Sequence, residues 1–250
     1  MERETILLLG HGSRDFNAIV EFTAFITLFK AETRRSLVFP AFLELASPSI
    51  PEAIQQAVSA GAKRIIAVPL FLFSGRHVLE DLPRILSESR AAFSGIELFY
   101  GKPLGLHPSI LELAAERIHG SSPPRPDDDQ SGLLVVGRGT LEPMAINETA
   151  RFTEQLAHRL SRPRVRHCFA EVSPPFLPGA LETILILGVK AVTIFPALLF
   201  TGIIIQRIQH QVAQQRKRYP GVSLSLAPYL GVHPLLVEAV QDQIAAAGAI

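Results

Sequence analysis

The sequence predicts an α/β protein built from two tandem, doubly wound, parallel-sheet lobes of the flavodoxin-like kind. First, residues 6–81 and 133–208 repeat one pattern, and four pairs of landmarks lie 127 positions apart. These pairs are Gly10 and Gly137, Glu44 and Glu171, Gly61 and Gly188, and Ser74 and Thr201. Second, short continuous apolar runs alternate with helical patterns, which is typical of a parallel sheet covered on both faces. Third, the duplication implies two lobes of roughly 120 residues, each long enough to bury its own core.

The elements follow from the apolar periodicity. In the first repeat, residues 6–9 form a buried strand, and apolar residues three and four positions apart predict a helix over 17–31. The first repeat continues with strand 38–45, helix 49–60, strand 64–73, helix 77–92, strand 96–100 and helix 108–119. The second repeat predicts strand 133–136, helix 144–160, strand 165–172, helix 176–187, strand 191–200, helix 204–218, strand 223–227 and helix 234–246.

The repeat divides the chain into two domains. Residues 1–120 form an N-terminal lobe and residues 133–250 a C-terminal lobe. Residues 121–132, SSPPRPDDDQSG, are rich in Pro, Ser and Asp and are expected to be a linker. We expect the two lobes to be related by a pseudo-twofold axis, with a cleft between them. His107 and His233 precede the last helix of their repeats in a Leu-Gly-X-His-Pro motif, so both are interpreted as structural helix-entry residues.

Composition limits the function classes. Hydrophobic residues make up 48% of the chain and the net charge is +1, so no nucleic-acid partner is expected. Cys168 is the only cysteine, which excludes an internal disulfide and a cysteine-built zinc or iron–sulfur site. The N-terminal apolar stretch is too short for a secretory signal, and residues 192–205 fall short of the roughly 20 residues of a membrane helix. We therefore expect a cytoplasmic protein with no membrane partner.

Three polar residues follow the three leading strands of the first repeat. His11 lies between two glycines after the first strand, Glu44 ends the second, and His77 follows the third. Functional groups of doubly wound sheets gather beyond the carboxyl ends of the strands, so we expect these side chains to share one site. Alternatives remain at each position. His11 could cap the next helix or belong to a loop that binds phosphate through its backbone, His77 could be a surface histidine, and Glu44 could be partly structural.

The second repeat has lost both histidines. Arg138 replaces His11 and Ile204 replaces His77, whereas Glu171 retains the carboxylate of Glu44. The N-terminal lobe is therefore predicted to be the catalytic one. Several arginines are expected near the same edge of the sheets, where surface solvation explains each one singly but together they could hold an acidic ligand. These arginines are Arg14, Arg76, Arg138 and Arg207.

Several ordered motifs resemble those of the sirohydrochlorin chelatases, which are ATP-independent class II tetrapyrrole chelatases. The motifs are ILLLGHGSRD, FLELASPSIPEA, PLFLFSGRHVLEDLP, LLVVGRGT and PYLGVHPLLVEAV, and they span nearly the whole chain, as in the long two-lobed members. The resemblance implies insertion of Fe²⁺ or Co²⁺ into sirohydrochlorin, toward sirohaem or cobalamin, with Ni²⁺ as a third candidate ion. It also implies that His11 and His77 hold the metal and take up pyrrole protons, with Glu44 as the accompanying carboxylate.

The residue chemistry agrees with metal transfer. Imidazole suits Fe²⁺, Co²⁺ and Ni²⁺ and can accept protons near neutral pH. A site with few protein ligands can release its ion, so the metal is expected to be a substrate rather than a resident cofactor. No nucleotide and no iron–sulfur cluster is expected. We further hypothesise that Arg138 binds a substrate carboxylate, and that the chain is a monomer. Other substrate-binding candidates are Ser13, Arg14, Arg76 and Arg207.

Two rival functions stay open at this point. One is a non-catalytic metal or tetrapyrrole carrier on the same scaffold, because fold alone does not establish catalysis. The other is a nucleotide- or phosphate-binding enzyme that uses GHGSRD as its anion loop. The sequence also leaves open which metal is used and whether Glu44 binds metal or relays protons.

Overall fold

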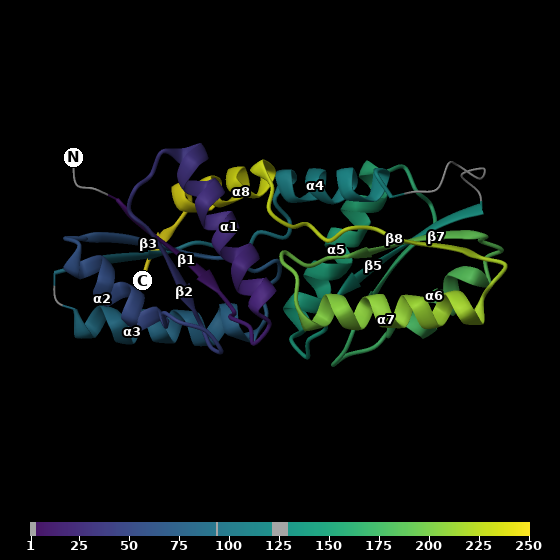
Figure 1. Ribbon diagram of the computed structural model, residues 1–250, viewed down its shortest axis with the longest axis horizontal. Coiled ribbons are helices and arrows are strands. Elements are labelled where there is room, and N and C mark those ends of the chain that lie inside the picture. The colour runs from purple at the N-terminus through teal and green to yellow at the C-terminus, as the bar shows by residue number, and fades with distance from the viewer. Residues whose placement is uncertain (1–3, 94, 122–129) are drawn as a thin grey trace. The chain divides into compact units, whose positions relative to one another are not determined.

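The computed structural model describes residues 4–93, 95–121 and 130–250, and its contacts divide the chain into two compact units. Unit 1 comprises residues 1–109 and 232–250, and unit 2 comprises residues 110–231. Each unit is an α/β body with helices on both faces of a mainly parallel sheet, which confirms the predicted fold class (Figure 1). Most of the expected linker, residues 122–129, lies outside the described residues.

The sheet of unit 1 has the strand order β2-β1-β3-β4-β9. Its strands are β1 (Thr5–Gly10), β2 (Val38–Phe42), β3 (Arg64–Pro69), β4 (Glu97–Tyr100) and β9 (Gly248–Ala249). The first four pair in parallel, and β9 pairs antiparallel with β4. The helices are α1 (Phe16–Thr33), α2 (Ile50–Ser59), the short π-helix η1 (His77–Asp81), α3 (Leu82–Ala92) and α8 (Pro234–Ala245).

Strand β1 lies at the centre of this unit and is buried along its whole length. Side chains alternate along a strand, so Leu7 and Leu9 project to one face, where they join a cluster with residues of α2 and α3. The other face is covered by α1 and α8 (Figure 1). Burial on both faces explains why the strand sequence ILLL is apolar without alternation.

Unit 2 repeats this topology with the strand order β6-β5-β7-β8. Its strands are β5 (Ser131–Gly137), β6 (Val165–Phe169), β7 (Ala191–Pro196) and β8 (Ser223–Leu226). Its helices are α4 (Pro108–His119), α5 (Pro143–Arg159), α6 (Leu177–Leu185) and α7 (Ile203–Arg218). Cys168 is fully buried in β6, and burial raises the pKa of its thiol above the usual range. It is therefore a small, unreactive core residue.

The last helices of the two repeats are exchanged between the units. Helix α8, from the second repeat, packs on α1 and β3 of unit 1. Its Asp242 carboxylate lies 3.0 Å from His107 Nε2, and its Gln243 side-chain oxygen accepts from the Lys102 N–H at 3.1 Å. Most of α4, from the first repeat, belongs to unit 2, where Arg117 donates to the Leu230 carbonyl. The packed units therefore cross the sequence boundaries expected at residues 120 and 133.

The two repeated histidines stand where α4 and α8 begin. His107 Nδ1 accepts from the Ser109 N–H, and His233 Nδ1 accepts from the Leu235 N–H, each at 3.3 Å. Each ring therefore satisfies a backbone donor in the first turn of its helix, which has no intrahelical partner. This confirms their interpretation as helix-entry residues.

Several predicted elements differ from the observed ones. In the second repeat, strands 165–172 and 191–200 end early, at Phe169 and Pro196. Strand 38–45 ends at Phe42, and the left-handed φ of 60° at Leu45 excludes that residue from an extended strand. Strand 64–73 ends at Pro69, although the apolar run continues, since apolarity reports burial rather than strand pairing. Helix 77–92 begins with the five-residue π-helix η1 before α3.

None of the helices in the described residues is both long and apolar enough to cross a membrane.

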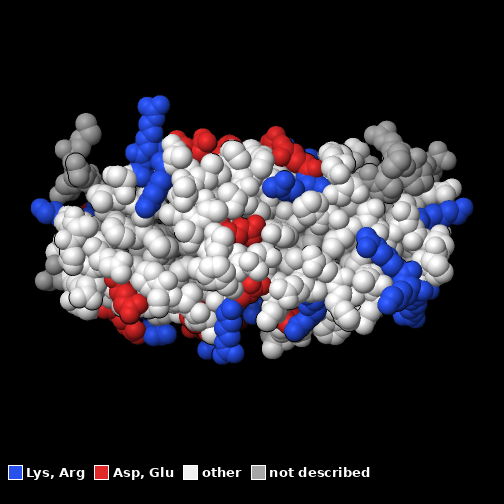
Figure 2. Space-filling view, in the orientation of Figure 1, with Lys and Arg blue, Asp and Glu red and all other residues white. Residues whose placement is uncertain are grey.

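On the face in view, small groups of acidic and basic side chains are separated by uncharged surface (Figure 2). With a net charge of +1, any charged ligand must be held by local side chains.

Candidate metal centre

The structure brings three predicted site residues to one edge of the sheet of unit 1. His11 directly follows β1, Glu44 lies two residues beyond β2, and His77 opens η1 after β3. Strands β2 and β3 flank β1 on opposite sides, so the connections leave β1 and β3 in opposite directions. Such a switch point in strand order is where doubly wound sheets bind ligands.

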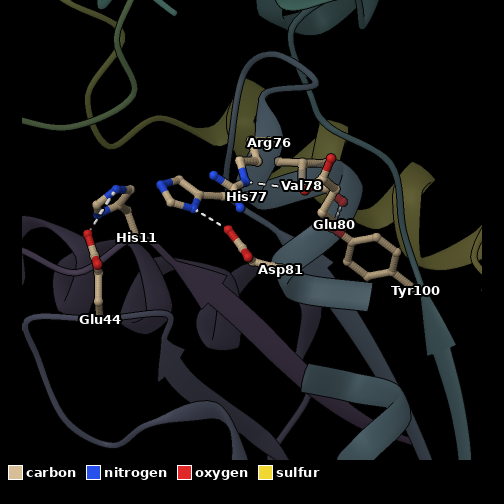
Figure 3. A network of polar contacts seen from close by, with 8 residues as sticks. All are labelled: His11, Glu44, Arg76, His77, Val78, Glu80, Asp81 and Tyr100. Atoms are coloured by element: carbon tan, nitrogen blue, oxygen red, sulfur yellow. Dashed lines mark hydrogen bonds and ion pairs between the residues drawn. The ribbon is translucent and has the colours of Figure 1, made fainter. Parts of the chain in front are cut away.

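The ligand atoms of these residues face one another (Figure 3). His11 Nε2 lies 3.4 Å from Glu44 Oε1, and the His11 and His77 ring centroids are 4.9 Å apart at 82°. One ligand atom from each of the three residues lies within 4.8 Å of the others. Donors to a shared ion at bonds of about 2.1 Å lie about 3–4 Å apart, so a small side-chain rotation completes a three-ligand site. The prediction that the two imidazoles meet is confirmed.

Each imidazole has one nitrogen engaged by an oxygen and the other directed into the cluster. His77 Nδ1 lies 2.8 Å from Asp81 Oδ2, and its other ring nitrogen faces His11 (Figure 3). His11 Nδ1 lies 3.3 Å from the Gly12 carbonyl, and its Nε2 faces Glu44. This is the arrangement of metal-binding histidines, in which an oxygen partner orients the ring.

The cluster is accessible but partly enclosed. The side chains of His11, His77 and Glu44 are 24%, 38% and 48% exposed. The ring of Phe71 packs against the His11 ring at a centroid distance of 6.3 Å. A hydrated ion can therefore reach the ligands from solvent, while the aromatic contact limits rotation of His11.

The loop after β1 is fastened to the loop after β2 by the backbone. The Leu43 N–H donates to the Gly10 carbonyl and the Glu44 N–H to the His11 carbonyl, at 2.9 and 3.0 Å. Gly12 has a φ of +90°, and a Cβ there would lie 1.7 Å from the Glu44 carbonyl oxygen. Only glycine allows this close approach, which places His11 beside Glu44.

The predicted substrate-binding residues of unit 1 lie outside the three-ligand cluster. Arg76 pairs with Glu80 at 3.2 Å on the exposed side of η1, and Arg14 is exposed. Ser13 Oγ accepts from the Asp15 N–H at 2.9 Å, just before α1. Their contact with a substrate stays a prediction.

Both repeats of this chain match the model of one protein family. Residues 5–121 and residues 132–247 each match the family model described as CbiX. This chain belongs to the CbiX family. The two matched segments coincide with the two repeats found in the sequence, so the chain holds a tandem pair of CbiX modules.

Among curated CbiX relatives, a sirohydrochlorin cobaltochelatase of Priestia megaterium is 30% identical over 96% of this chain and 78% of its own length. A sirohydrochlorin ferrochelatase of the same organism is 29% identical over 96% of this chain and 89% of its own length. Among solved structures, the sirohydrochlorin chelatase SirB of Bacillus subtilis subspecies spizizenii, in complex with cobalt, has a TM-score of 0.81 and 26% identity. That alignment covers 97% of this chain and 94% of SirB. SirB from Bacillus subtilis with Fe³⁺ has a TM-score of 0.83 at the same identity and coverage.

The second CbiX module keeps the backbone of the site but not its candidate ligands. The Glu171 N–H donates to the Arg138 carbonyl at 3.1 Å, and Gly139 approaches the Glu171 carbonyl as Gly12 approaches that of Glu44. Val172, like Leu45, has a left-handed φ. The side chains differ, because Glu171 pairs with Arg138 at 3.6 Å and also with Arg207. Two guanidiniums thus neutralise the carboxylate that, in the first CbiX module, faces two histidines.

Sequence reasoning missed two features of these CbiX modules. One is Asp81, which bonds His77 and lies within a pattern that looks like ordinary helix. The other is that Glu171 holds both predicted substrate arginines of the second module. The sequence signal for this second feature was the retained carboxylate of Glu171 together with two arginines, Arg138 and Arg207, that have no arginine counterpart in the first repeat.

Proposed function

We propose that this protein inserts a divalent metal, Fe²⁺ or Co²⁺, into sirohydrochlorin without ATP. The observation that carries the proposal is the cluster of His11, Glu44 and His77, whose ligand atoms lie within 4.8 Å of one another at the carboxyl edge of one sheet. The curated relatives named above, which match nearly the whole chain, are sirohydrochlorin chelatases. Ni²⁺ is a third candidate ion.

The cluster supplies what metallation requires. The ion must lose water, be presented to one face of the macrocycle and replace both inner pyrrole protons. His11, His77 and Glu44 can replace part of the hydration shell while leaving the remaining positions of the ion open to the macrocycle nitrogens. As the ion leaves, the freed imidazoles and carboxylate are bases close to the protons released from the ring. The exposed apolar side chain of Leu45, next to Glu44, can contact the face of a flat macrocycle.

The rate of metallation tests this function. With sub-stoichiometric protein, Fe²⁺ or Co²⁺ should shift the sirohydrochlorin absorbance faster than in the uncatalysed reaction and through many equivalents. Parallel assays with Fe²⁺, Co²⁺ and Ni²⁺ rank the ions. Conversion that stops at one equivalent per protein would instead identify a carrier. Stabilisation by nucleotide, with no metallation, would identify an enzyme that uses the GHGSRD loop for phosphate.

We further propose that the second module holds substrate carboxylates through Arg138 and Arg207. Their exposed fractions are 49% and 45%, and the single charge of Glu171 leaves the group with a net positive charge. A carboxylate of the substrate can therefore compete with Glu171 for bidentate contacts. In unit 1, Ser13, Arg14 and Arg76 are the corresponding candidates.

Two substitutions with opposite expected effects test this assignment. Arg138→Ala should raise KM for sirohydrochlorin by about 10-fold, with a much smaller change in kcat. The reason is that the arginine binds a substrate carboxylate that lies far from the reacting atoms. Glu171→Gln should lower KM, since it removes the competing carboxylate. Steady-state kinetics at fixed metal concentration separate the two constants. A fall in kcat with unchanged KM for Arg138→Ala would contradict a substrate-holding role.

The other properties expected from the sequence stay predictions. They are a catalytic N-terminal lobe and a substrate-holding C-terminal lobe, related by a pseudo-twofold with a cleft between them, in a cytoplasmic monomer that uses no nucleotide and no iron–sulfur cluster. Light scattering of the purified chain tests the oligomeric state directly.

A further inference from the structure

The two repeats differ by one residue within the segment that carries His77. In the sheets, Ala67 pairs with Tyr100 and Ile194 pairs with Leu226, so these two pairs are equivalent. Ala67 and Ile194 are 127 positions apart, whereas Tyr100 and Leu226 are 126 apart. The first repeat therefore contains one extra residue between β3 and β4.

The extra residue lies in η1. Val78 and Ile205 are buried counterparts 127 positions apart, whereas the next buried pair, Leu82 and Ile208, is 126 apart. Three residues, 79–81, separate the buried positions in the first repeat, and two, 206–207, separate them in the second. Helix α7 runs as regular α-helix through this region, whereas η1 is a π-helix. One residue inserted into an α-helix produces such a π-turn, and π-turns are frequent at functional sites.

Two residues specific to the first repeat accommodate the wider turn. The Leu82 N–H donates to the His77 carbonyl, five positions back, which is the π-type bond. Pro83 has no N–H to offer the Val78 carbonyl, and the Tyr100 hydroxyl donates to that carbonyl at 3.1 Å instead. Burial raises the pKa of Tyr100 above its usual range, so its hydroxyl remains a donor. The counterparts in the second repeat are Gln209 and Leu226.

The π-turn ends on Asp81, whose carboxylate contacts the His77 ring. Asp81 Oδ2 lies 2.8 Å from His77 Nδ1, and the Asp81 side chain is only 26% exposed. The charged neighbours on this turn, Arg76 and Glu80, pair with each other instead (Figure 3). A carboxylate accepting from Nδ1–H leaves the lone pair of His77 on Nε2, the nitrogen that faces His11.

We propose that the inserted π-turn exists to place Asp81, and that Asp81 is a positioning residue that orients His77 and selects its metal-binding tautomer. The inference rests on the proposed function of the cluster. The second repeat is the internal comparison, because it lacks the histidine, the extra residue and the π-turn together. Loss of such a carboxylate partner of a metal-binding histidine typically costs about 10- to 100-fold in metal affinity or activity.

The test uses full-length Asp81→Ala and Asp81→Asn proteins. In the metal-free wild type, ¹⁵N NMR of the imidazoles, with His77 assigned by its loss in His77→Gln, should show a proton on Nδ1. Asp81→Ala should shift the population toward the Nε2–H tautomer and weaken Co²⁺ binding, followed by its visible absorption, about 10- to 100-fold. Asp81→Asn, whose amide oxygen can still accept from Nδ1, should retain part of the affinity. The matched control is Glu88→Ala, which breaks the exposed Arg84–Glu88 pair on α3 and should leave both readouts unchanged.

The outcomes separate this inference from the proposed function. If Asp81→Ala leaves both the tautomer and the Co²⁺ affinity of wild type, the inference is wrong, whatever the enzyme does. If both change but wild type fails to metallate sirohydrochlorin, Asp81 still positions His77, and the proposed function is the part that fails. A thermal melt of each variant confirms that the comparison is between folded proteins.

Discussion

Replacing His11 by alanine should lower kcat/KM for metal insertion by at least about 100-fold, the lower end of what a positioned base contributes. In the proposed function His11 supplies both an ion ligand and a proton acceptor, and its Nε2 lies 3.4 Å from Glu44 Oε1. Removing the ring leaves Glu44 and His77 as the described members of the cluster. The measurement is the initial rate of sirohydrochlorin metallation with Fe²⁺ and with Co²⁺. His77→Ala should give a loss of the same order.

The matched control for His11→Ala is His119→Ala. His119 is exposed at the end of α4, in unit 2, and its removal should leave kcat/KM unchanged. Co²⁺ titration should show that His11→Ala weakens metal binding while the thermal transition is retained. A His11→Ala protein that metallates at the wild-type rate would place the chemistry elsewhere in the molecule.

Gly12→Ala should destabilise unit 1 by more than about 4 kcal/mol and abolish Co²⁺ binding at the cluster. Two effects combine at this position. An alanine in a left-handed conformation costs about 1–2 kcal/mol by itself. In addition, its Cβ would lie 1.7 Å from the Glu44 carbonyl oxygen, so the loops carrying His11 and Glu44 must separate. Urea unfolding and Co²⁺ titration measure the two consequences.

Two other glycines isolate these effects. Gly61→Ala meets nothing within 4 Å at a φ of +88°, so it should show the conformational cost alone. Gly139→Ala would bring a Cβ within 1.8 Å of the Glu171 carbonyl oxygen. It should therefore destabilise unit 2 while the cluster of unit 1 still binds Co²⁺. Equal losses of stability for Gly12→Ala and Gly61→Ala would show that the contact with Glu44 is unimportant.

Much of the candidate site was predictable from the sequence because parallel strands end at a common edge. Once residues 6–9, 38–45 and 64–73 are predicted to be buried strands, the polar residues at or just beyond their carboxyl ends must lie near one another. His11, Glu44 and His77 meet this condition, and they meet in space. The loss of histidines at positions 138 and 204 likewise predicts that the first repeat holds the metal ligands.

The positions of individual contacts were less predictable. Apolar periodicity does not report backbone conformation, so it extended the second strand through Leu45, although the strand ends at Phe42 and Leu45 has a left-handed φ. For the same reason it gave one helix over 77–92 and did not distinguish the π-turn from regular helix. The contact of Asp81 with His77 lies within that turn.

The sequence by itself determined the fold class, the duplication and the choice of the three candidate ligands, because these depend on residue type and on the order of apolar segments. Only the tertiary structure decided that α8 covers the sheet of unit 1 and most of α4 belongs to unit 2, that Asp81 bonds His77, and that Glu171 pairs with Arg138 and Arg207. Helices α4 and α8 follow the same Leu-Gly-X-His-Pro motif, so nothing local distinguishes their partners. A periodic pattern predicts that one face of a helix is buried, whereas the element that packs on that face depends on the path of the whole chain.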